Sequence, residues 1–382
     1  MRWQAQTHGA HGRDDGNDAG APALPGLRHA GLSEAGRRDA ERRRTARTPQ
    51  FAGMTFHEVQ ARSVLNRVPE ASAMPFRWTV NPYRGCTHAC RYCYARSTHE
   101  YLDLDAGADF DQQIVVKTNA PDVLRVELSR PTWTRESVAL GTNTDPYQRA
   151  EGRYRLMPGI IAALADTGTP FSILTKGTLL ARDVPELATA ARSVPVGVGV
   201  SLATLDSRLA ATVEPGTPAP AARLALIERL RTAGADVHVM AMPLLPWLSD
   251  SDAQLDALMR AVRAAGASSV LAGALHLRPG ARQWYMQWLR HEHPHLVDGY
   301  ERLYARSSYA PASYRSSLTR RARAAAAAHG LRWGGAHRIR SDDAPPHGTR
   351  GSHADVATTR AEHRRSGSSA SASAPARQAA LF

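Results

Sequence analysis

Three cysteines lie within eight residues of one another, and they are the only cysteines in the chain: Cys86, Cys90 and Cys93, spaced C-x-x-x-C-x-x-C. Thiolates are soft ligands that select iron–sulfur clusters, zinc or copper. A chain that places its whole thiol supply in one short segment therefore predicts a thiolate metal site there.

The segment around these cysteines resembles the motif of the radical S-adenosylmethionine (SAM) superfamily. Three thiolates are one fewer than the four that usually hold a four-iron, four-sulfur (4Fe-4S) cluster. The resemblance implies that the open iron is chelated by the amino and carboxylate groups of SAM. It also implies that Tyr92, the aromatic residue before the last cysteine, packs beside the adenine. The motif does not identify a catalytic residue.

Other interpretations of the cysteines use different chemistry. A structural zinc site needs four ligands, so His88 or His99 would complete it. His88 stands between two cysteines, where a short loop is hard to close into a tetrahedron. A disulfide is disfavoured because the cysteine count is odd and nothing marks the chain as secreted. Three unrelated buried cysteines are the remaining alternative.

Composition divides the 382 residues into parts. Residues 1–50 and 336–382 lack apolar periodicity and are rich in small, polar and basic residues, so we expect two disordered tails. Residues 51–75 are expected to form an arm with one short helix. Residues 76–335 have the size of one barrel domain with covering helices at its C-terminal end.

Net charge and hydropathy give only weak evidence about binding partners. The formal net charge is +13, yet only Lys117 and Lys176 among the 48 basic residues are lysines. A GC-rich coding bias explains so much arginine, so nucleic acid stays an open partner. No signal-peptide core and no apolar run of about 18 residues is visible. We expect a cytoplasmic monomer without a membrane partner.

Strand-like and helix-like patterns alternate after residue 76. Strands are expected at 76–80, 137–140, 171–174, 194–202, 237–242 and 269–275, with helical patterns between them. Such alternation predicts a parallel sheet. Six strands are too few to close an eight-stranded barrel, so the predicted fold is α/β, a partial (β/α)6 TIM-like barrel.

Polar residues follow three of these strands, where barrel active sites are built. They are Asn143, Thr144 and Asp145 after the second strand, Lys176 after the third and Ser201 near the end of the fourth. We expect these side chains to bind SAM, although Lys176 could instead bind an anionic substrate and Ser201 could face its own turn. The alternatives are that Thr144 or Asp145 forms a helix cap or turn and that Lys176 is a solvated rim residue.

Further segments are similar to one branch of the superfamily, which is related to spore photoproduct lyase and often labelled "DNA repair photolyase". They are residues 81–96, 144–148, 173–176, 214–216 and 243–246. The resemblance implies reductive cleavage of SAM to a 5′-deoxyadenosyl radical, with an external electron donor such as a flavodoxin or ferredoxin.

One residue departs from this branch. The lyase returns a hydrogen atom from a cysteine at the position of Thr142, and Thr142 has no thiol. We therefore predict a radical SAM enzyme of unassigned substrate and no dimer reversal by that route. A nucleic-acid-directed radical lyase or modification enzyme, and a non-enzymatic zinc or iron–sulfur module, are the alternatives.

Overall fold

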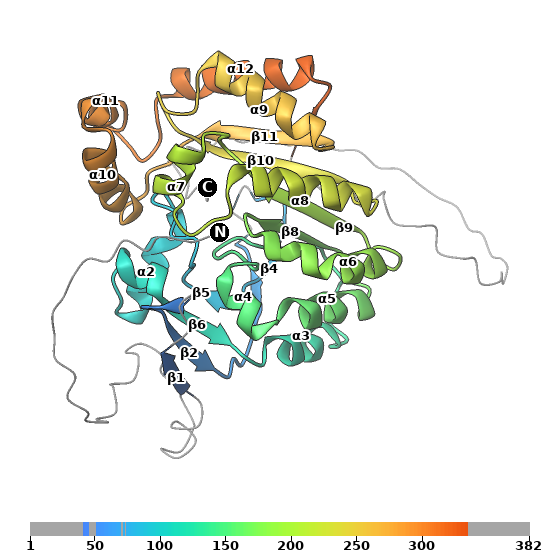
Figure 1. The fold of residues 1–382 in the computed structure, drawn as a ribbon. Helices are drawn as coiled ribbons and strands as arrows, with labels where there is room; N and C mark the ends of the chain where they lie inside the picture. The colour runs from blue at the N-terminus through green and yellow to red at the C-terminus, as the bar shows by residue number, and fades with distance from the viewer. Residues whose placement is uncertain (1–40, 46–50, 70–71, 73, 335–382) are drawn as a thin grey trace, which may run out of the picture.

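The main sheet of the computed structural model has eight strands in the order β12-β11-β10-β9-β8-β7-β4-β3 (Figure 1). The structure describes residues 41–45, 51–69, 72 and 74–334. Strands β4 to β12 of this sheet run parallel, and β3 is antiparallel to β4. The edge strands β3 and β12 do not pair with each other. The sheet is therefore an open, partial barrel, as the sequence predicts.

The six predicted parallel strands are confirmed, with ends that move by one or two residues. The strands of the main sheet are β3 (Leu65–Arg67), β4 (Trp78–Val80), β7 (Val138–Leu140), β8 (Phe171–Thr175), β9 (Val196–Ser201), β10 (Val237–Leu244), β11 (Ser269–Ala274) and β12 (Arg332–Trp333). Because the carboxyl ends of parallel strands lie at one edge, the residues that follow them are brought together there.

Helices cover the outside of the sheet, as Figure 1 shows for α3, α5, α6, α8 and α9. Their bounds, with those of the neighbouring short helices, are α3 (Ala120–Leu128), α4 (Arg149–Tyr154), α5 (Met157–Asp166), η3 (Thr178–Asp183), α6 (Val184–Ala190), α8 (Pro220–Thr232), α9 (Asp252–Ala264) and α12 (Ala312–Ala328). Together with the strands they bury one large apolar core.

Among the helices, α9 is the one that the sequence predicts most clearly. Leu255, Leu258, Met259 and Val262 recur at helical spacing, and all four are buried against the sheet. The side chain of Ser251 accepts a hydrogen bond from the backbone of Gln254 and so caps the helix. Packing of this apolar stripe fixes the helix on the sheet.

A smaller sheet lies beside the barrel, and sequence reasoning missed it. Its order is β1-β2-β6-β5, formed by β1 (Glu41–Thr45), β2 (Thr55–Val59), β6 (Gln113–Lys117) and β5 (Tyr83–Arg84). The short helix expected within residues 51–68 is wrong, because this segment forms β2 and β3. Strand β2 pairs with β6, which lies more than fifty residues further on, so the pairing has no local signal.

Two predicted tails lie almost wholly outside the described residues. The exception is β1, which falls inside the range 1–50 and pairs with β2 in an antiparallel ladder. β1 pairs with the free edge of β2 through backbone hydrogen bonds, and a polar sequence can form these bonds.

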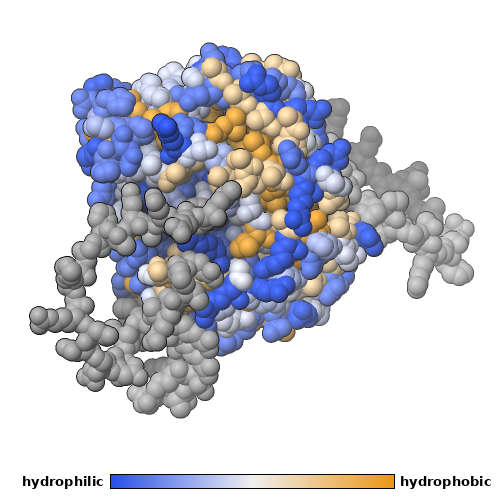
Figure 2. Space-filling view, viewed as in Figure 1, coloured by the Kyte–Doolittle hydropathy of each residue, from blue (hydrophilic) through white to orange (hydrophobic). Residues whose placement is uncertain are grey.

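None of the helices in the described part of the chain is long and apolar enough to cross a bilayer. Figure 2 shows hydrophilic residues over much of one face, around a band of hydrophobic residues near α8.

Lys117 at the end of β6 is half-buried. Burial first, and then the nearby charge of Arg84, lowers the pKa of Lys117 from 10.5 to about 8. Because the unfolded chain binds this proton more tightly, the cost is fully present below pH 8 and disappears as the pH rises toward 10.5. We expect Lys117→Met to raise the free energy of unfolding by about 1–3 kcal/mol at pH 7.

Urea unfolding at pH 7 and at pH 10.5 measures this effect. The stabilisation should shrink at the higher pH, since Lys117 of the folded wild-type chain is then neutral and no longer carries the cost of a buried ammonium. A variant that is less stable than the wild type at pH 7 would contradict the assignment of Lys117 as a destabilising ammonium.

A second apolar cluster covers the cysteine segment from outside the barrel. It includes Tyr285 and Trp288 of α10 (Ala281–Glu292) and Tyr300 of α11 (Val297–Leu303), which pack with Cys90 and Tyr92. The short elements around it are η2 (Tyr94–Leu102), α2 (Ala108–Gln112), α7 (Ser207–Val213) and η4 (Pro294–Leu296). This cluster shields one side of the cysteine segment from water.

Candidate active site

The three cysteines line one cavity of about 230 Å³ at the carboxyl ends of the strands. Cys86 and Cys90 are buried and Cys93 is half-buried. The segment turns tightly, because the backbone N–H of Ala89 donates to Cys86 and that of Cys93 donates to Cys90. Ala89 has a φ of 54°, in the left-handed region. The turns direct all three thiols into the same space.

The loop after α7 holds the cysteine segment from the other side. The N–H of Arg91 donates to the carbonyl of Val213, and the N–H of Gly216 donates to the carbonyl of His88. A Cβ at Gly216 would lie 1.9 Å from the carbonyl oxygen of Thr87. Only glycine allows this contact, so the loop packs directly on the cysteine segment.

Arg96 ties the cysteine segment to the neighbouring helices. Its side chain is fully buried, and its Nε donates to the carbonyl of Cys90 over 3.0 Å. Its Nη2 also donates to both carboxylate oxygens of Asp111, at 2.8 and 3.1 Å. The arrangement places a fixed positive group next to a thiol, where it favours a thiolate.

Burial acts against thiolate formation in this cavity. It raises the pKa of Cys90 well above its ordinary value and is also the main cause that raises the pKa of Cys93 to about 11. Thiols in such a place become thiolates most readily when a metal takes the proton's place. The donor set therefore fits a thiolate-bound cluster better than free thiols.

Asp145 is the centre of the polar groups after β7. Its carboxylate accepts from the hydroxyl of Thr175 at 2.5 Å, and from the N–H groups of Lys176 and Tyr147 at 2.7 and 2.9 Å. The ring of His88 lies 3.3 Å away. Burial raises the pKa of Asp145, but the pairing with His88 and these donors outweigh it and leave the pKa below its ordinary value.

Thr144 is turned toward the protein. Its hydroxyl donates to the carbonyl of Gly85 at 2.7 Å and accepts from the amide of Gln148 at 2.8 Å. Gln148 in turn accepts from the N–H of Thr87. Thr144 therefore positions the cysteine segment, whereas the exposed Asn143 lines the cavity with a side chain that has no hydrogen-bond partner among the described residues.

Lys176 and Ser201 meet at the cavity wall, as their positions after β8 and at the end of β9 predict. The Lys176 ammonium donates to the Ser201 hydroxyl at 2.6 Å and lies 3.2 Å from Glu214. Glu214 also accepts from the phenol of Tyr92 and pairs with Arg223. The lysine is thus held in place rather than solvated.

Glu214 and Arg223 are residues that sequence reasoning missed. Both are nearly fully buried, with 3% and 1% of their surface exposed. Glu214 belongs to the segment 214–216 that resembles the lyase branch, but its link to Tyr92 and Lys176 joins three separate segments. Arg223 is one arginine among many and carried no signal.

The other wall of the cavity is apolar. Met240, Met242 and Pro243 of β10 line it. His276 after β11 also lines it and was missed. Its ring stacks on Tyr309 with centroids 3.8 Å apart, and burial, with nearby Arg278, lowers its pKa to about 4. His276 is therefore neutral at pH 7.

Three other histidine or arginine side chains do not line the cavity. The ring of His99 bonds the carbonyl of Gln113 at 2.9 Å and does not line the cavity. His238 bonds the hydroxyl of Ser269. Arg278 lies over the ring of Tyr94, at 5.7 Å from its centroid. Across the described residues, no three His, Cys, Asp or Glu side chains are grouped to hold a single metal ion.

The fold and the site together define an open α/β barrel in which three cysteines line one cavity at the carboxyl ends of the strands. The family model described as "Radical SAM superfamily" matches residues 80–259. An uncharacterized protein of Mycobacterium tuberculosis is 58% identical over 323 residues, which cover 84% of this chain and 90% of that protein. Another, of Methanocaldococcus jannaschii, is 26% identical over 195 residues, 50% of this chain and 69% of that protein.

Solved structures show the same fold. A point variant of spore photoproduct lyase superposes with a TM-score of 0.50 and 13% sequence identity, over 72% of this chain and 80% of that chain. The chain belongs to the radical SAM superfamily. It is a radical SAM enzyme and not a non-enzymatic metal module, and the family implies a 4Fe-4S cluster, SAM and a reductant.

Proposed function

We propose that this enzyme holds its cluster through the thiolates of Cys86, Cys90 and Cys93 and keeps one iron for SAM. The observation that carries this is that the three thiols, the whole cysteine content of the chain, open into one cavity. When bound and reduced, the cluster supplies an electron that cleaves SAM into methionine and a 5′-deoxyadenosyl radical, which takes a hydrogen atom from the substrate.

The walls of the cavity suit the two ends of SAM. Lys176, Ser201 and Asn143 offer an ammonium, a hydroxyl and an amide to its amino and carboxylate groups. Met240 and Met242 offer an apolar surface to its adenine. Opposite polarity on two walls is what orients an amphiphilic cofactor.

Tyr92, Thr144 and Asp145 contribute by holding these walls in place. Tyr92 lines the cavity while Glu214 fixes its phenol, so its ring keeps one orientation. Thr144 fixes the carbonyl of Gly85 before the first cysteine, and Asp145 fixes the backbone of Lys176. Cofactor geometry depends on such supporting contacts as much as on direct ones.

Thr142 supports no hydrogen return. Its hydroxyl lies 3.4 Å from Asn81, and its carbonyl accepts from the phenol of Tyr94. The three cysteines of the proposed cluster are all the thiols present. We therefore propose no thymine-dimer reversal through a thiol at this position, and we leave the substrate to be identified.

We also propose that a flavodoxin or ferredoxin reduces the enzyme in the cytoplasm. A cluster at the reducing end of the range of iron–sulfur potentials needs a donor of low potential and a compartment low in oxygen. The buried aromatic cluster of α10 and α11 protects the cysteine segment from water.

Anaerobic reconstitution tests the proposal. Purified protein is loaded with iron and sulfide, reduced with dithionite and mixed with SAM. We expect visible charge-transfer absorbance and the release of 5′-deoxyadenosine and methionine. Protein that gains the absorbance but releases no 5′-deoxyadenosine would contradict the proposed reaction, and protein that gains no absorbance would contradict the proposed cluster.

A further inference from the structure

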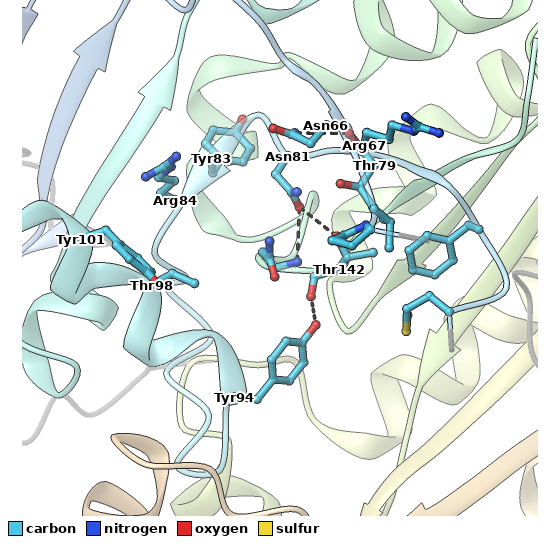
Figure 3. A pocket seen from close by; sticks show the side chains of 15 residues that line it. Asn66, Arg67, Thr79, Asn81, Tyr83, Arg84, Tyr94, Thr98, Tyr101 and Thr142 are labelled. Atoms are coloured by element: carbon cyan, nitrogen blue, oxygen red, sulfur yellow. Dashed lines mark hydrogen bonds between the residues drawn. The ribbon is translucent and has the colours of Figure 1, made fainter. Parts of the chain in front are cut away.

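A second cavity, of about 310 Å³, lies next to the first. Five residues line both of them: Met74, Phe76, Tyr94, Thr142 and Asn143. Figure 3 shows Tyr94 reaching toward Thr142 at this shared wall. A molecule in the second cavity therefore lies directly beside the cavity proposed for SAM.

The described lining of the second cavity is rich in positive and hydrogen-bonding groups. It contains Arg67 and Arg84, several amides and hydroxyls, and neither aspartate nor glutamate. Arg84 is exposed and forms no ion pair or hydrogen bond through its side chain with the described residues. Two guanidinium groups in a concave site without a carboxylate favour a bound anion.

Asn81 lies between the two arginines at the wall of the second cavity, as Figure 3 shows. Only 7% of its surface is exposed. Its Oδ1 accepts from the hydroxyl of Thr142 at 3.4 Å and from the N–H of Asn143 at 3.3 Å. Its Nδ2 donates to no described residue and is reached by solvent, so the amide nitrogen faces the open cavity. A donor in that position can bind an oxygen of a ligand.

The charge of Arg84 is not neutralised nearby. It is, after burial, the second cause that lowers the pKa of Lys117. It also contributes to the lowered pKa of His99, whose main cause is burial. Both contributions are those expected of a positive charge on Arg84.

We propose that the second cavity binds the substrate, and that this substrate carries a phosphate or carboxylate group that Arg84 and Asn81 hold. The proposal rests on the proposed function, because the shared wall places the rest of such a molecule against the cavity assigned to SAM. The anionic group holds the substrate in the second cavity. The reactive bond of the substrate then lies at the shared wall, next to Tyr94, Thr142 and Asn143.

Calorimetric titration of the cluster-loaded, SAM-saturated protein tests this. The probes are uridine, uridine monophosphate, succinate, inorganic phosphate and a single-stranded tetranucleotide. We expect at least one organic anion to bind with a Kd below about 1 mM and uridine to bind at least about tenfold more weakly than its monophosphate. Tight binding of the tetranucleotide alone would identify nucleic acid as the source of the phosphate.

Variants locate the bound anion. Arg84→Gln should weaken binding of the best probe about tenfold or more, because a charge-assisted contact is lost. Arg84→Lys should recover part of that loss. Asn81→Asp keeps the two accepted hydrogen bonds but adds a negative charge, so it should abolish binding. Arg192→Gln, at an exposed arginine after α6, is the matched control and should change nothing.

The proposal is overturned if no organic anion binds, if uridine binds as well as its monophosphate, or if Arg84→Gln behaves like Arg192→Gln. Its failure is separable from failure of the proposed function. SAM cleavage by the unmutated protein needs no probe, so 5′-deoxyadenosine release without anion binding would remove this inference alone.

Discussion

Cys93→Ala is expected to abolish the release of 5′-deoxyadenosine, with a loss of more than about 1,000-fold, or about 4 kcal/mol in activation free energy. The reason is that three thiols line the cavity and the chain contains no fourth that could replace one. Anaerobic reconstitution followed by chromatography of the nucleoside products measures the loss. Cluster absorbance, recorded on the same samples, separates loss of the cluster from loss of chemistry.

The other two cysteines provide the comparison. Cys86→Ala and Cys90→Ala should fall to the same background, because each removes one of three anchors. Thermal melting in the absence of iron should place all three variants near the wild type, since the substitutions are small. Retention of nucleoside release by any one of them would contradict the three-thiolate assignment.

Sequence reasoning succeeded where one local pattern settles the position of a residue. Lys176 and Ser201 follow neighbouring parallel strands, so their meeting at the cavity wall could be predicted. The open barrel itself followed from the number of strand-like segments.

It failed where a contact joins distant segments. Thr144 is one example, because its hydroxyl bonds the carbonyl of Gly85 in the cysteine segment. Nothing in the polar run after β7 reveals which residue turns inward. Asn81 and Arg84 were read only as parts of the cysteine motif, because the cavity that they line also needs β3 and η2. Pairings of that kind require the tertiary structure.

Such long-range contacts also determine stability, as Glu214 shows. Glu214 is buried with Arg223 and Lys176 as its two cationic partners. Burial raises the pKa of its carboxyl, but these two charges outweigh it and hold the pKa far below its ordinary value. The contribution of Glu214 to stability is therefore present above its unfolded pKa of about 4.3 and is lost only as the pH falls through the lower folded value.

Glu214→Ala is expected to lower the free energy of unfolding by about 3–5 kcal/mol at pH 7, because it leaves the buried guanidinium of Arg223 without its carboxylate. Urea unfolding measures the loss. The double variant Glu214→Met/Arg223→Met should recover most of it, since an apolar pair of similar volume needs no partner. Glu228→Ala, on the exposed side of α8, is the control and should stay within about 0.5 kcal/mol of the wild type. If the double variant is no more stable than Glu214→Ala, the carboxylate does not act by neutralising Arg223, and the network around Lys176 must be held together by packing instead.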